Sequence, residues 1–363
     1  MKADKQCPAV SSVGESTKLE ASSLVLAGYY PPPFGGESVH IRELARRLRA
    51  DGLHVRIVNL RRGAPSSPEY RSISGRFSFV LVLMESLGPR SILHLHSNGH
   101  NWKSWLMISV AATVLRLRRA RGVLTLHSGL APDYLAHRGP FSRRALRLCL
   151  ASFGHIICVN ATIREALVRL GVSKSRLSVI PAYVGLPPAA PLSSADTKLV
   201  EAFDPLLVAC GGAGPEYGFP ILIKAVANLR QSFPKLGCVM MGSAGSDALR
   251  RLIDSLGVAD RVTCIENLPH EQFAAILSCA DVFVRPSYAD GDAVSVREAL
   301  ALGIPVVASD TDSRPDGVIL FRRGDVDELC RKVASALERG RATENTPPAA
   351  EPLPALLAIY QNL

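Results

Sequence analysis

Short apolar runs alternate with longer stretches of mixed apolar and polar residues along most of the chain, which is the pattern of an α/β protein. Residues 24–28 (LVLAG) come first and predict a buried strand. Residues 38–51 follow with an apolar stripe at helical spacing and predict a helix. Residues 54–60 (HVRIVNL) predict a second strand, so this part of the chain is a βαβ unit with parallel strands.

The same alternation continues to residue 180 and resumes at residue 206. In the first half we expect further strands at residues 91–97, 122–126, 155–159 and 177–180, and helices at residues 103–121, 143–153 and 162–170. In the second half we expect strands at residues 206–210, 237–242, 262–265, 282–285, 306–308 and 318–321, and helices at residues 219–232, 248–256, 270–278, 295–302, 325–338 and 353–363. Two such halves predict two doubly wound, Rossmann-like sheets that face each other across a cleft.

The interruption between the halves, GLPPAAPLSSADTKL from Gly185, has the proline, alanine and serine content of a linker. We expect a disordered tail over residues 1–20 and an N-terminal Rossmann-like domain over residues 21–186. A linker over residues 187–199 then leads to a second Rossmann-like domain over residues 200–345. Residues 346–363 are expected to form a C-terminal segment that packs back on the first domain.

Composition is that of a globular protein, with 47% hydrophobic and 20% charged residues among 363. No uninterrupted apolar run reaches 18 residues, so we expect no transmembrane helix. The polar N-terminus does not resemble a signal peptide. The eight cysteines are scattered and form no C-x-x-C pair, which favours core residues in a reducing cytoplasm over a zinc site or a disulfide framework.

The net charge of +10 is unevenly distributed along the chain. Residues 1–190 carry 26 lysines and arginines and 10 acidic residues (+16), whereas residues 191–363 carry 16 and 22 (−6). The first half therefore suits an acidic partner: anionic lipid headgroups, a diphosphate-linked acceptor or nucleic acid. Zinc-finger spacing, aromatic RNA-binding motifs and a recognition helix are absent from the sequence, so we expect no nucleic acid. A solvated basic surface is the alternative.

Residues 101–121 combine Trp102, Trp105, an apolar middle and a basic end. An interfacial helix on an anionic membrane has this pattern. A core helix with a basic last turn has the same pattern. Both interpretations stand, and the first predicts peripheral contact with the inner face of the cell membrane.

Two carboxylates, Asp290 and Glu298, lie eight positions apart in RPSYADGDAVSVREALALGIPVVASD. A glycine-containing turn and the start of a helix separate them, and a short apolar strand follows. This arrangement presents a small polar ligand to a helix N-terminus. The paired glycines Gly35 and Gly36 also precede a helix, where their backbone can approach an anion closely.

PPPFGGESVHIRELARRLRADGLHVRIV and PSYADGDAVSVREALALGIPVVASD resemble the two signatures of glycosyltransferase family 4, whose members are retaining enzymes with the GT-B fold. ILHLHS, VLTLHSG and LSVIPAYV fall between them in the family's order, and the resemblance covers roughly residues 24–340. It implies an N-terminal acceptor domain, a C-terminal domain for a nucleotide-sugar donor, and diphosphate binding without a protein-held metal.

The resemblance also implies roles for individual residues. Glu298 binds the donor ribose, whose diol needs an acceptor of this kind. Asp290 replaces a usual glutamate at the donor sugar, and His127 contacts the same sugar; we expect these three to be the catalytic residues. Other donor-binding residues are Gly35, Gly36, Gly212, Tyr217, Arg285, Gly291, Asp292, Ala293, Val294 and Ser295. His96 is expected on the acceptor side.

Metal binding is not expected, although two features of the sequence bear on it. Asp290-Gly291-Asp292 and Asp310-Thr311-Asp312 both read D-x-D, the metal motif of the unrelated GT-A enzymes. His94 and His96 share one face of a strand, but no third ligand is evident from the sequence. We expect no cofactor beyond the donor substrate.

The chain departs from the family at the diphosphate. The family has an arginine and a lysine where this chain has Gly212 and Tyr217, and its usual Asn-Gly pair is Ala182-Tyr183 here. Losing two cations that offset the charge of a leaving diphosphate should slow transfer unless they are replaced. Arg285, Arg297 and Arg314 are the candidate replacements.

Two hypotheses follow for the function. The first is a retaining glycosyltransferase that moves a sugar from a nucleotide-diphosphate donor to a saccharide or lipid-linked acceptor in cell-envelope or exopolysaccharide synthesis. The second is a catalytically inert GT-B module that binds nucleotide, glycan or a partner enzyme. A Rossmann dehydrogenase is disfavoured because GGAG at residues 211–214 is not G-x-G-x-x-G and no acidic residue follows at the required spacing.

Overall fold

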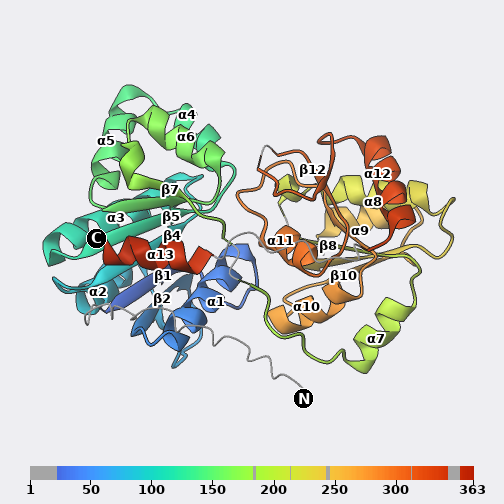
Figure 1. The fold of residues 1–363 in the computed structure, drawn as a ribbon, viewed down its shortest axis with the longest axis horizontal. Coiled ribbons are helices and arrows are strands. Elements are labelled where there is room, and N and C mark those ends of the chain that lie inside the picture. The colour runs from blue at the N-terminus through green and yellow to red at the C-terminus, as the bar shows by residue number, and fades with distance from the viewer. Residues whose placement is uncertain (1–22, 183–184, 213, 243–245, 312, 342–351) are drawn as a thin grey trace, which may run out of the picture.

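The computed structural model describes residues 23–182, 185–212, 214–242, 246–311, 313–341 and 352–363. The expected tail over residues 1–20 lies outside the described residues, as do Tyr183 and residues 346–351 of the expected C-terminal segment. The described chain forms two sheets of parallel strands that lie side by side, with helices around each sheet (Figure 1). The prediction of two doubly wound, Rossmann-like sheets is confirmed.

The first sheet has seven strands in the order β3-β2-β1-β4-β5-β6-β7, and every neighbouring pair is parallel. Its strands are β1 (Leu24–Gly28), β2 (Val55–Arg62), β3 (Arg71–Ile73), β4 (Ile92–Ser97), β5 (Arg121–Leu126), β6 (His155–Cys158) and β7 (Leu177–Val179). The strand order reverses between β1 and β4, so their carboxyl ends open a crevice for a ligand.

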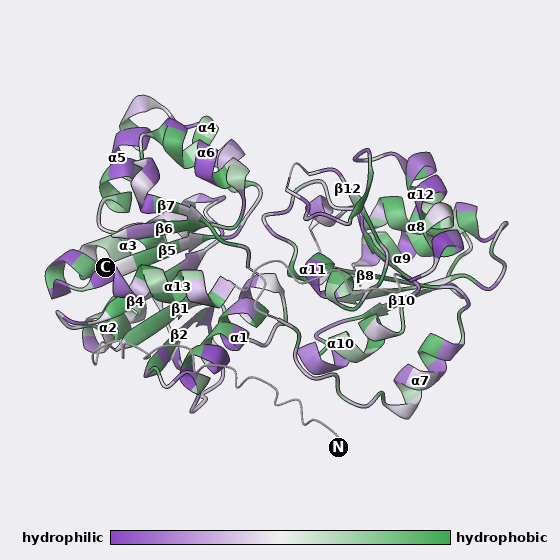
Figure 2. Cartoon of the chain, in the orientation of Figure 1, coloured by the Kyte–Doolittle hydropathy of each residue, from purple (hydrophilic) through white to green (hydrophobic). Residues whose placement is uncertain are grey.

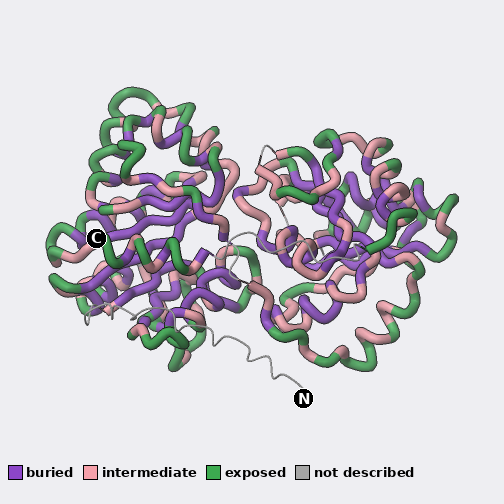
Figure 3. The backbone as a smooth tube through the Cα atoms, in the orientation of Figure 1, coloured by how far each residue is buried: buried purple, intermediate pink, exposed green. Residues whose placement is uncertain are grey.

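Six helices connect these strands: α1 (Gly36–Ala50), α2 (Arg76–Ser86), α3 (Trp102–Arg118), α4 (Ala131–Ala136), α5 (Pro140–Leu150) and α6 (Ala161–Leu170). The apolar side chains of α2, α3, α5 and α6 pack on one face of the sheet. The stripe of α1 packs on the opposite face, where Ile41, Leu44 and Leu48 are fully buried. With both faces of the sheet covered, the central strands β1, β4 and β5 are buried along almost their whole length (Figure 3).

The second sheet has six parallel strands in the order β10-β9-β8-β11-β12-β13, reversing between β8 and β11. Its strands are β8 (Leu206–Gly211), β9 (Gly237–Gly242), β10 (Val262–Ile265), β11 (Val282–Arg285), β12 (Val306–Ser309) and β13 (Ile319–Phe321). Its helices are α8 (Phe219–Leu229), α9 (Asp247–Ser255), α10 (His270–Ser278), α11 (Val294–Ala301) and α12 (Val326–Arg339).

Among the α-helices and β-strands of the described residues, four were not expected from the sequence: β3, α2, α4 and α7 (Ser194–Glu201). α2 was not predicted because its run VLVLM has no helical stripe and is too short for the pattern to distinguish a helix from a strand. α7 lies in the stretch expected to be a linker. It begins where the side chain of Ser193 accepts a hydrogen bond from the Asp196 N–H, which is a helix-capping contact.

The last helix, α13 (Pro352–Gln361), lies on the first sheet although it follows the second in the sequence (Figure 1). Its Tyr360 is 1% exposed, and its hydroxyl makes a 2.6 Å hydrogen bond with Nδ1 of His94 on β4. The other ring nitrogen of His94 lies 2.7 Å from the Thr125 hydroxyl on β5. Both nitrogens of a buried imidazole are therefore satisfied, and one of the partners comes from the far end of the chain.

We expect Tyr360→Phe to lower the free energy of unfolding by about 1–2 kcal/mol, because His94 then keeps a buried nitrogen without its partner. Urea denaturation measures this change. Tyr288→Phe is the matched control, since Tyr288 is 46% exposed. Equal stability of the two variants would mean that the bond between α13 and β4 contributes nothing.

Candidate active site

A cavity of about 460 Å³ lies between the two sheets, at the carboxyl ends of their strands. The GG turn before α1 and the loops after β4 and β5 line one side, and the loops after β8 and β11 line the other. Every residue expected to be catalytic or donor-binding lies in its wall, from both halves of the chain. His96, expected on the acceptor side, is instead 1% exposed and lies behind His127.

The loop Asp290–Asp292 touches the first domain directly. The Asn160 side chain donates a 2.7 Å hydrogen bond to the Gly291 carbonyl, and the Ala182 N–H donates one of 2.8 Å to the Asp292 carboxylate. A Cβ on Gly291 would lie 1.7 Å from the His127 carbonyl oxygen, so only glycine allows this approach. The Asp290–Asp292 loop is therefore packed directly against the loop that carries His127.

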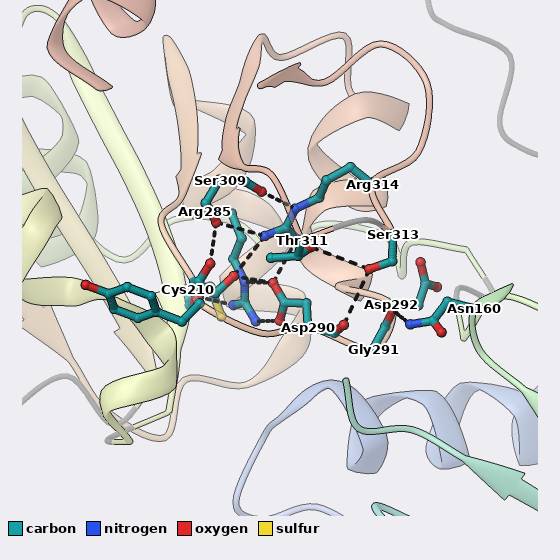
Figure 4. A network of polar contacts seen from close by, with 12 residues as sticks. Asn160, Cys210, Arg285, Asp290, Gly291, Asp292, Ser309, Thr311, Ser313 and Arg314 are labelled. Carbon is teal, nitrogen blue, oxygen red and sulfur yellow. Dashed lines mark hydrogen bonds and ion pairs between the residues drawn. The ribbon is translucent and has the colours of Figure 1, made fainter. Parts of the chain in front are cut away.

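Asp290 is the centre of a buried ion cluster (Figure 4). Arg285 makes two hydrogen bonds to its carboxylate, from Nε to Oδ2 at 3.0 Å and from Nη2 to Oδ1 at 2.5 Å. Arg314 Nη1 donates to Oδ2 at 2.7 Å, and the Ser287 hydroxyl donates to the same oxygen. Burial alone would raise the pKa of Asp290, but the two guanidinium groups outweigh burial and hold it well below its usual range.

The three arginines proposed to replace the family's missing arginine and lysine are all paired with aspartates. Arg285 and Arg314 share Asp290, and Arg297 donates to Asp292 at 2.7 Å. Two arginines and one aspartate leave one net positive charge at the end of β11. The carboxylates of Asp290 and Asp292 are engaged by arginines, so this D-x-D sequence does not present free carboxylates to a metal.

Arg285 also reaches the loop where the family's cations are missing. Its Nη1 donates to the Cys210 carbonyl at the end of β8, and its guanidinium carbon lies 5.1 Å from the ring centroid of Tyr217. The Tyr217 ring in turn lies against Gly211 and Gly212. A cation from β11 is thereby placed beside Gly212, although the sequence of the loop itself provides none.

Glu298 projects from α11 into the cavity and is 2% exposed. Its Oε1 lies 2.5 Å from Nε2 of His270, at the start of α10. This contact orients the carboxylate and was not expected from the sequence, where His270 and Glu298 are 28 residues apart. Nδ1 of His270 is a buried nitrogen without a hydrogen-bond partner among the described residues.

The helix α11 begins at the cavity wall. Ala293 is the N-cap residue, has an extended conformation and makes no side-chain capping hydrogen bond. Val294 and Ser295 in the first turn line the cavity. First-turn N–H groups have no partner within their own helix and carry the positive end of its dipole. This helix start has the geometry of an anion site, and anion binding here stays a prediction.

The GG turn faces α11 from the other domain. The Ser38 hydroxyl accepts from the Gly35 N–H at 3.0 Å and fixes the turn at the start of α1. Glu37 lies in the same turn. Its carboxylate lines the cavity and accepts a long hydrogen bond of 3.4 Å from the Tyr29 N–H. Burial raises the pKa of Glu37 to about 7, because this bond only partly offsets desolvation. Sequence reasoning did not single out Glu37.

Four histidines gather at the cavity wall, where His127 lines the cavity and His40, His94 and His96 lie behind it. His96 Nδ1 and His127 Nε2 are 3.0 Å apart, and the His40 ring centroid lies 5.3 Å and 5.4 Å from those of His96 and His127. Burial lowers the pKa of His40 to about 4, that of His94 to about 3, and those of His96 and His127 well below their usual value. These imidazoles are therefore neutral near pH 7.

Three of them, His40, His96 and His127, offer nitrogens within 4.8 Å of one another and could hold a metal ion. The sequence suggested His94 and His96 without a third ligand. His94 is instead held by Tyr360 and Thr125, and the additional nitrogens come from α1 and from the loop after β5. Only the folding of α1 beside β4 brings these histidines together.

We expect the protein to lose stability as the pH falls below about 6.5. The unfolded histidines take up protons there, whereas the folded ones stay neutral until lower pH, so the unfolded state binds more protons. Each such histidine should cost about 2 kcal/mol between pH 7 and pH 5. Glu37 acts in the opposite direction, because its raised pKa favours the folded state as the pH falls from 7 towards 4.5.

Denaturation at a series of pH values, comparing His96→Asn with wild type, measures the histidine contribution. The variant should show a shallower loss of stability below pH 6.5. His137→Asn is the matched control, because His137 is exposed. Identical pH profiles for all three proteins would contradict a neutral, buried His96.

Comparison with known proteins agrees with this geometry. Residues 34–184 match the model of Glycosyltransferase Family 4, and residues 198–350 match that of Glycosyl transferases group 1. A GDP-mannose-dependent alpha-(1-6)-phosphatidylinositol monomannoside mannosyltransferase of Mycolicibacterium smegmatis is 27% identical over 272 residues, which are 63% of this chain and 71% of that protein. A D-inositol 3-phosphate glycosyltransferase of Mycobacterium sp. (strain JLS) is 30% identical, over 52% of this chain and 46% of its own length.

Solved structures show the same fold. Anabaena HepE in complex with UDP and glucose has a TM-score of 0.67 at 18% identity, covering 93% of this chain and 95% of its own. A sucrose-phosphate synthase from Thermosynechococcus elongatus has a TM-score of 0.66 at 23% identity, covering 87% and 90%. Both family models together span most of the chain, and the solved structures share its fold. The chain therefore belongs to glycosyltransferase family 4 and is a GT-B glycosyltransferase of the retaining type.

Proposed function

We propose that the protein moves a sugar from a nucleotide-diphosphate donor to a saccharide or lipid-linked saccharide acceptor, in the synthesis of the cell envelope or of an exopolysaccharide. One observation carries the proposal: the buried Glu298 carboxylate opens into the cavity beside the start of α11 and opposite His127. The cavity between the two domains is therefore lined by three groups: a carboxylate that can accept hydrogen bonds from a sugar diol, a helix start that can bind an anion, and a neutral imidazole.

The donor nucleotide fits the second domain. Glu298, held by His270, can accept both hydrogen bonds of a ribose diol. The first-turn amides of α11 can bind a diphosphate oxygen at the positive end of the helix dipole. Arg285 and Arg314 add the one positive charge that Asp290 leaves uncompensated, which partly makes up for Gly212 and Tyr217.

The donor sugar would lie between Asp290 and His127. The His127 imidazole is neutral, so it can donate or accept a hydrogen bond at a sugar hydroxyl without adding charge. In the front-face displacement implied by the resemblance, the departing phosphate takes the proton of the acceptor hydroxyl. The chain then has to position both substrates and hold the leaving group, and needs no nucleophile of its own.

The acceptor would enter from the first domain. The Mycolicibacterium relative is named for a phosphatidylinositol monomannoside acceptor, and the Mycobacterium relative for an inositol phosphate. We propose a glycan or lipid-linked glycan acceptor for this chain too, used at the inner face of the cell membrane. In the described residues, no helix is both long and apolar enough to cross a bilayer.

A second candidate, an inert GT-B module that binds nucleotide or glycan, is favoured by one observation. The arginines that could replace the missing cations are all engaged by Asp290 or Asp292. A leaving diphosphate that meets one net charge instead of two would depart more slowly.

We expect a panel of nucleotide sugars to contain one whose nucleotide is released when acceptor extract is added. Glu298→Gln keeps the volume of the side chain but removes a charged acceptor, and should slow release by about 100-fold. Glu266→Gln, at an exposed position of the same domain, is the matched control. Binding without release selects the inert module, and neither binding nor release for any donor would contradict the transferase.

We expect Asp290→Asn to free Arg285 and Arg314 for the diphosphate. Two buried guanidinium groups lose their carboxylate, so the free energy of unfolding should fall by about 2–4 kcal/mol. Added UDP or GDP should then stabilise the variant more than it stabilises wild type, because the diphosphate takes the place of the carboxylate. Thermal denaturation with and without each nucleotide measures this. A smaller stabilisation of the variant than of wild type would show that the two arginines do not face the diphosphate.

A further inference from the structure

The positive charge of the protein is concentrated in one segment. Residues 86–164 contain eleven lysines and arginines and one acidic residue, Asp133. Eleven minus one gives +10, which equals the formal net charge of the whole chain. The rest of the sequence is therefore neutral overall, and a partner that responds to charge should meet this segment first.

This segment forms α3 and α5, and α3 packs between α5 and α2 on one face of the first sheet. Eleven large apolar side chains are exposed in the described residues, and seven of them belong to these three helices. They include Phe77 and Leu81 on α2, Trp102 and Leu106 on α3, and Phe141 and Leu148 on α5. Figure 2 shows hydrophobic and hydrophilic positions mixed along α2 and α3.

The exposed apolar side chains follow one stripe on each helix. Phe77 and Leu81 are four residues apart, as are Trp102 and Leu106, so each pair points the same way. Trp105 shows the opposite side of α3: it is 3% exposed, and its indole N–H donates to the Gly99 carbonyl at 2.9 Å. The two tryptophans therefore lie on opposite sides of α3: Trp105 faces the core, and Trp102, which is 62% exposed, faces outward.

The arginines beside these stripes lack carboxylate partners in the contacts that the structure shows. Arg116 donates to the Leu148 carbonyl at 2.8 Å, Arg118 to the Leu87 carbonyl at 2.7 Å, and Arg143 to the Arg169 carbonyl at 2.6 Å. Carbonyl groups orient a guanidinium without neutralising it. Lys103 and Arg144 are exposed on α3 and α5, so this outer face is apolar on all three helices and strongly positive on α3 and α5.

Topology places one end of this face at the cleft. α2 follows β3 and α3 follows β4, so both begin at the carboxyl edge of a parallel sheet, whereas α5 follows β5 only after α4. Phe77, Trp102 and Phe141 lie in the first turns of the three helices. The loops after β4 and β5 at that edge also line the cavity with Asn98, His100 and His127.

We propose that the outer face of α2, α3 and α5 docks on a lipid bilayer that contains anionic lipids. Phe77, Trp102 and Phe141 enter the boundary between headgroups and acyl chains, and the arginines and lysines of α3 and α5 bind lipid phosphates. Charge selects this occupant, because a partner has to supply many negative charges over α3 and α5, as an anionic leaflet does. A lipid-linked acceptor would then reach the cavity from the docked edge, and only this consequence rests on the proposed function.

Co-sedimentation with vesicles tests the proposal on the full chain without any sugar nucleotide. Vesicles of phosphatidylcholine alone are compared with vesicles that contain about 30 mol% phosphatidylglycerol, at low and high salt. Wild type should sediment with the anionic vesicles at low salt at least about five-fold more than with the neutral ones. Raising the salt should remove most of this preference.

Two variants and their matched controls separate the face from the overall charge. Arg144→Glu and the double variant Trp102→Ser/Phe141→Ser should each lose most of the binding to anionic vesicles. Arg251→Glu and Leu320→Ser change an exposed arginine and an exposed leucine of the second domain, and should bind as wild type does. Circular dichroism of each variant checks that it folds, and the second variant tests the face if one fails.

Three outcomes would overturn the proposal: no sedimentation, equal sedimentation with neutral and anionic vesicles, or equal loss in the variants and their controls. A dimer in solution that the double variant dissolves, without vesicle binding, would assign the face to self-association instead. Vesicle binding without nucleotide release in the donor panel would support the docking face and count against the transferase, so the two proposals fail separately.

Discussion

The cleft depends on the buried pairing of Asp290 with Arg285 and Arg314. This carboxylate joins the end of β11 to the segment after β12, and its Arg285 reaches across to the end of β8. Three neighbouring strands of the second sheet are thereby tied at their carboxyl edge. The backbone that follows Asp290 is then presented to the first domain, where Asn160 holds the Gly291 carbonyl. A buried ion pair that loses one partner leaves an uncompensated charge, so this wall tolerates little change.

The same cluster distinguishes this site from a donor pocket with two free cations. Where the loop after β8 has Gly212 and Tyr217, the guanidinium of Arg285 arrives from β11 and lies over the Tyr217 ring. One aspartate balances one of two arginines, so the site keeps a single net charge near the expected diphosphate. The amides at the start of α11 add a partial charge that does not depend on any side chain. Weak but sufficient stabilisation of a leaving group and simple nucleotide binding are both consistent with this balance.

The first domain has two chemically different surfaces. At the cleft, neutral imidazoles and the Glu37 carboxylate line a space for polar groups. On its outer face, exposed aromatic side chains alternate with arginines that are bonded to carbonyls rather than to acids. Both surfaces meet at the carboxyl edge of β4 and β5, because a parallel sheet places the starts of its connecting helices beside its ligand site. An acceptor held in a membrane would need this proximity.

The alternation of apolar runs and helical stripes determined the two sheets, and Asp290 and Glu298 around a helix start indicated a site for a small polar ligand, because these are local signals. α2 was missed since a short run of uniformly apolar residues has no period, and α7 since its capping serine lies in a proline-rich stretch. Only the tertiary structure paired Glu298 with His270, placed His40 beside His96 and His127, and brought Tyr360 to His94. It also turned Trp102 outward and Trp105 inward. These contacts join residues far apart in the chain or depend on which helix face is covered, and neither leaves a periodic trace in the sequence.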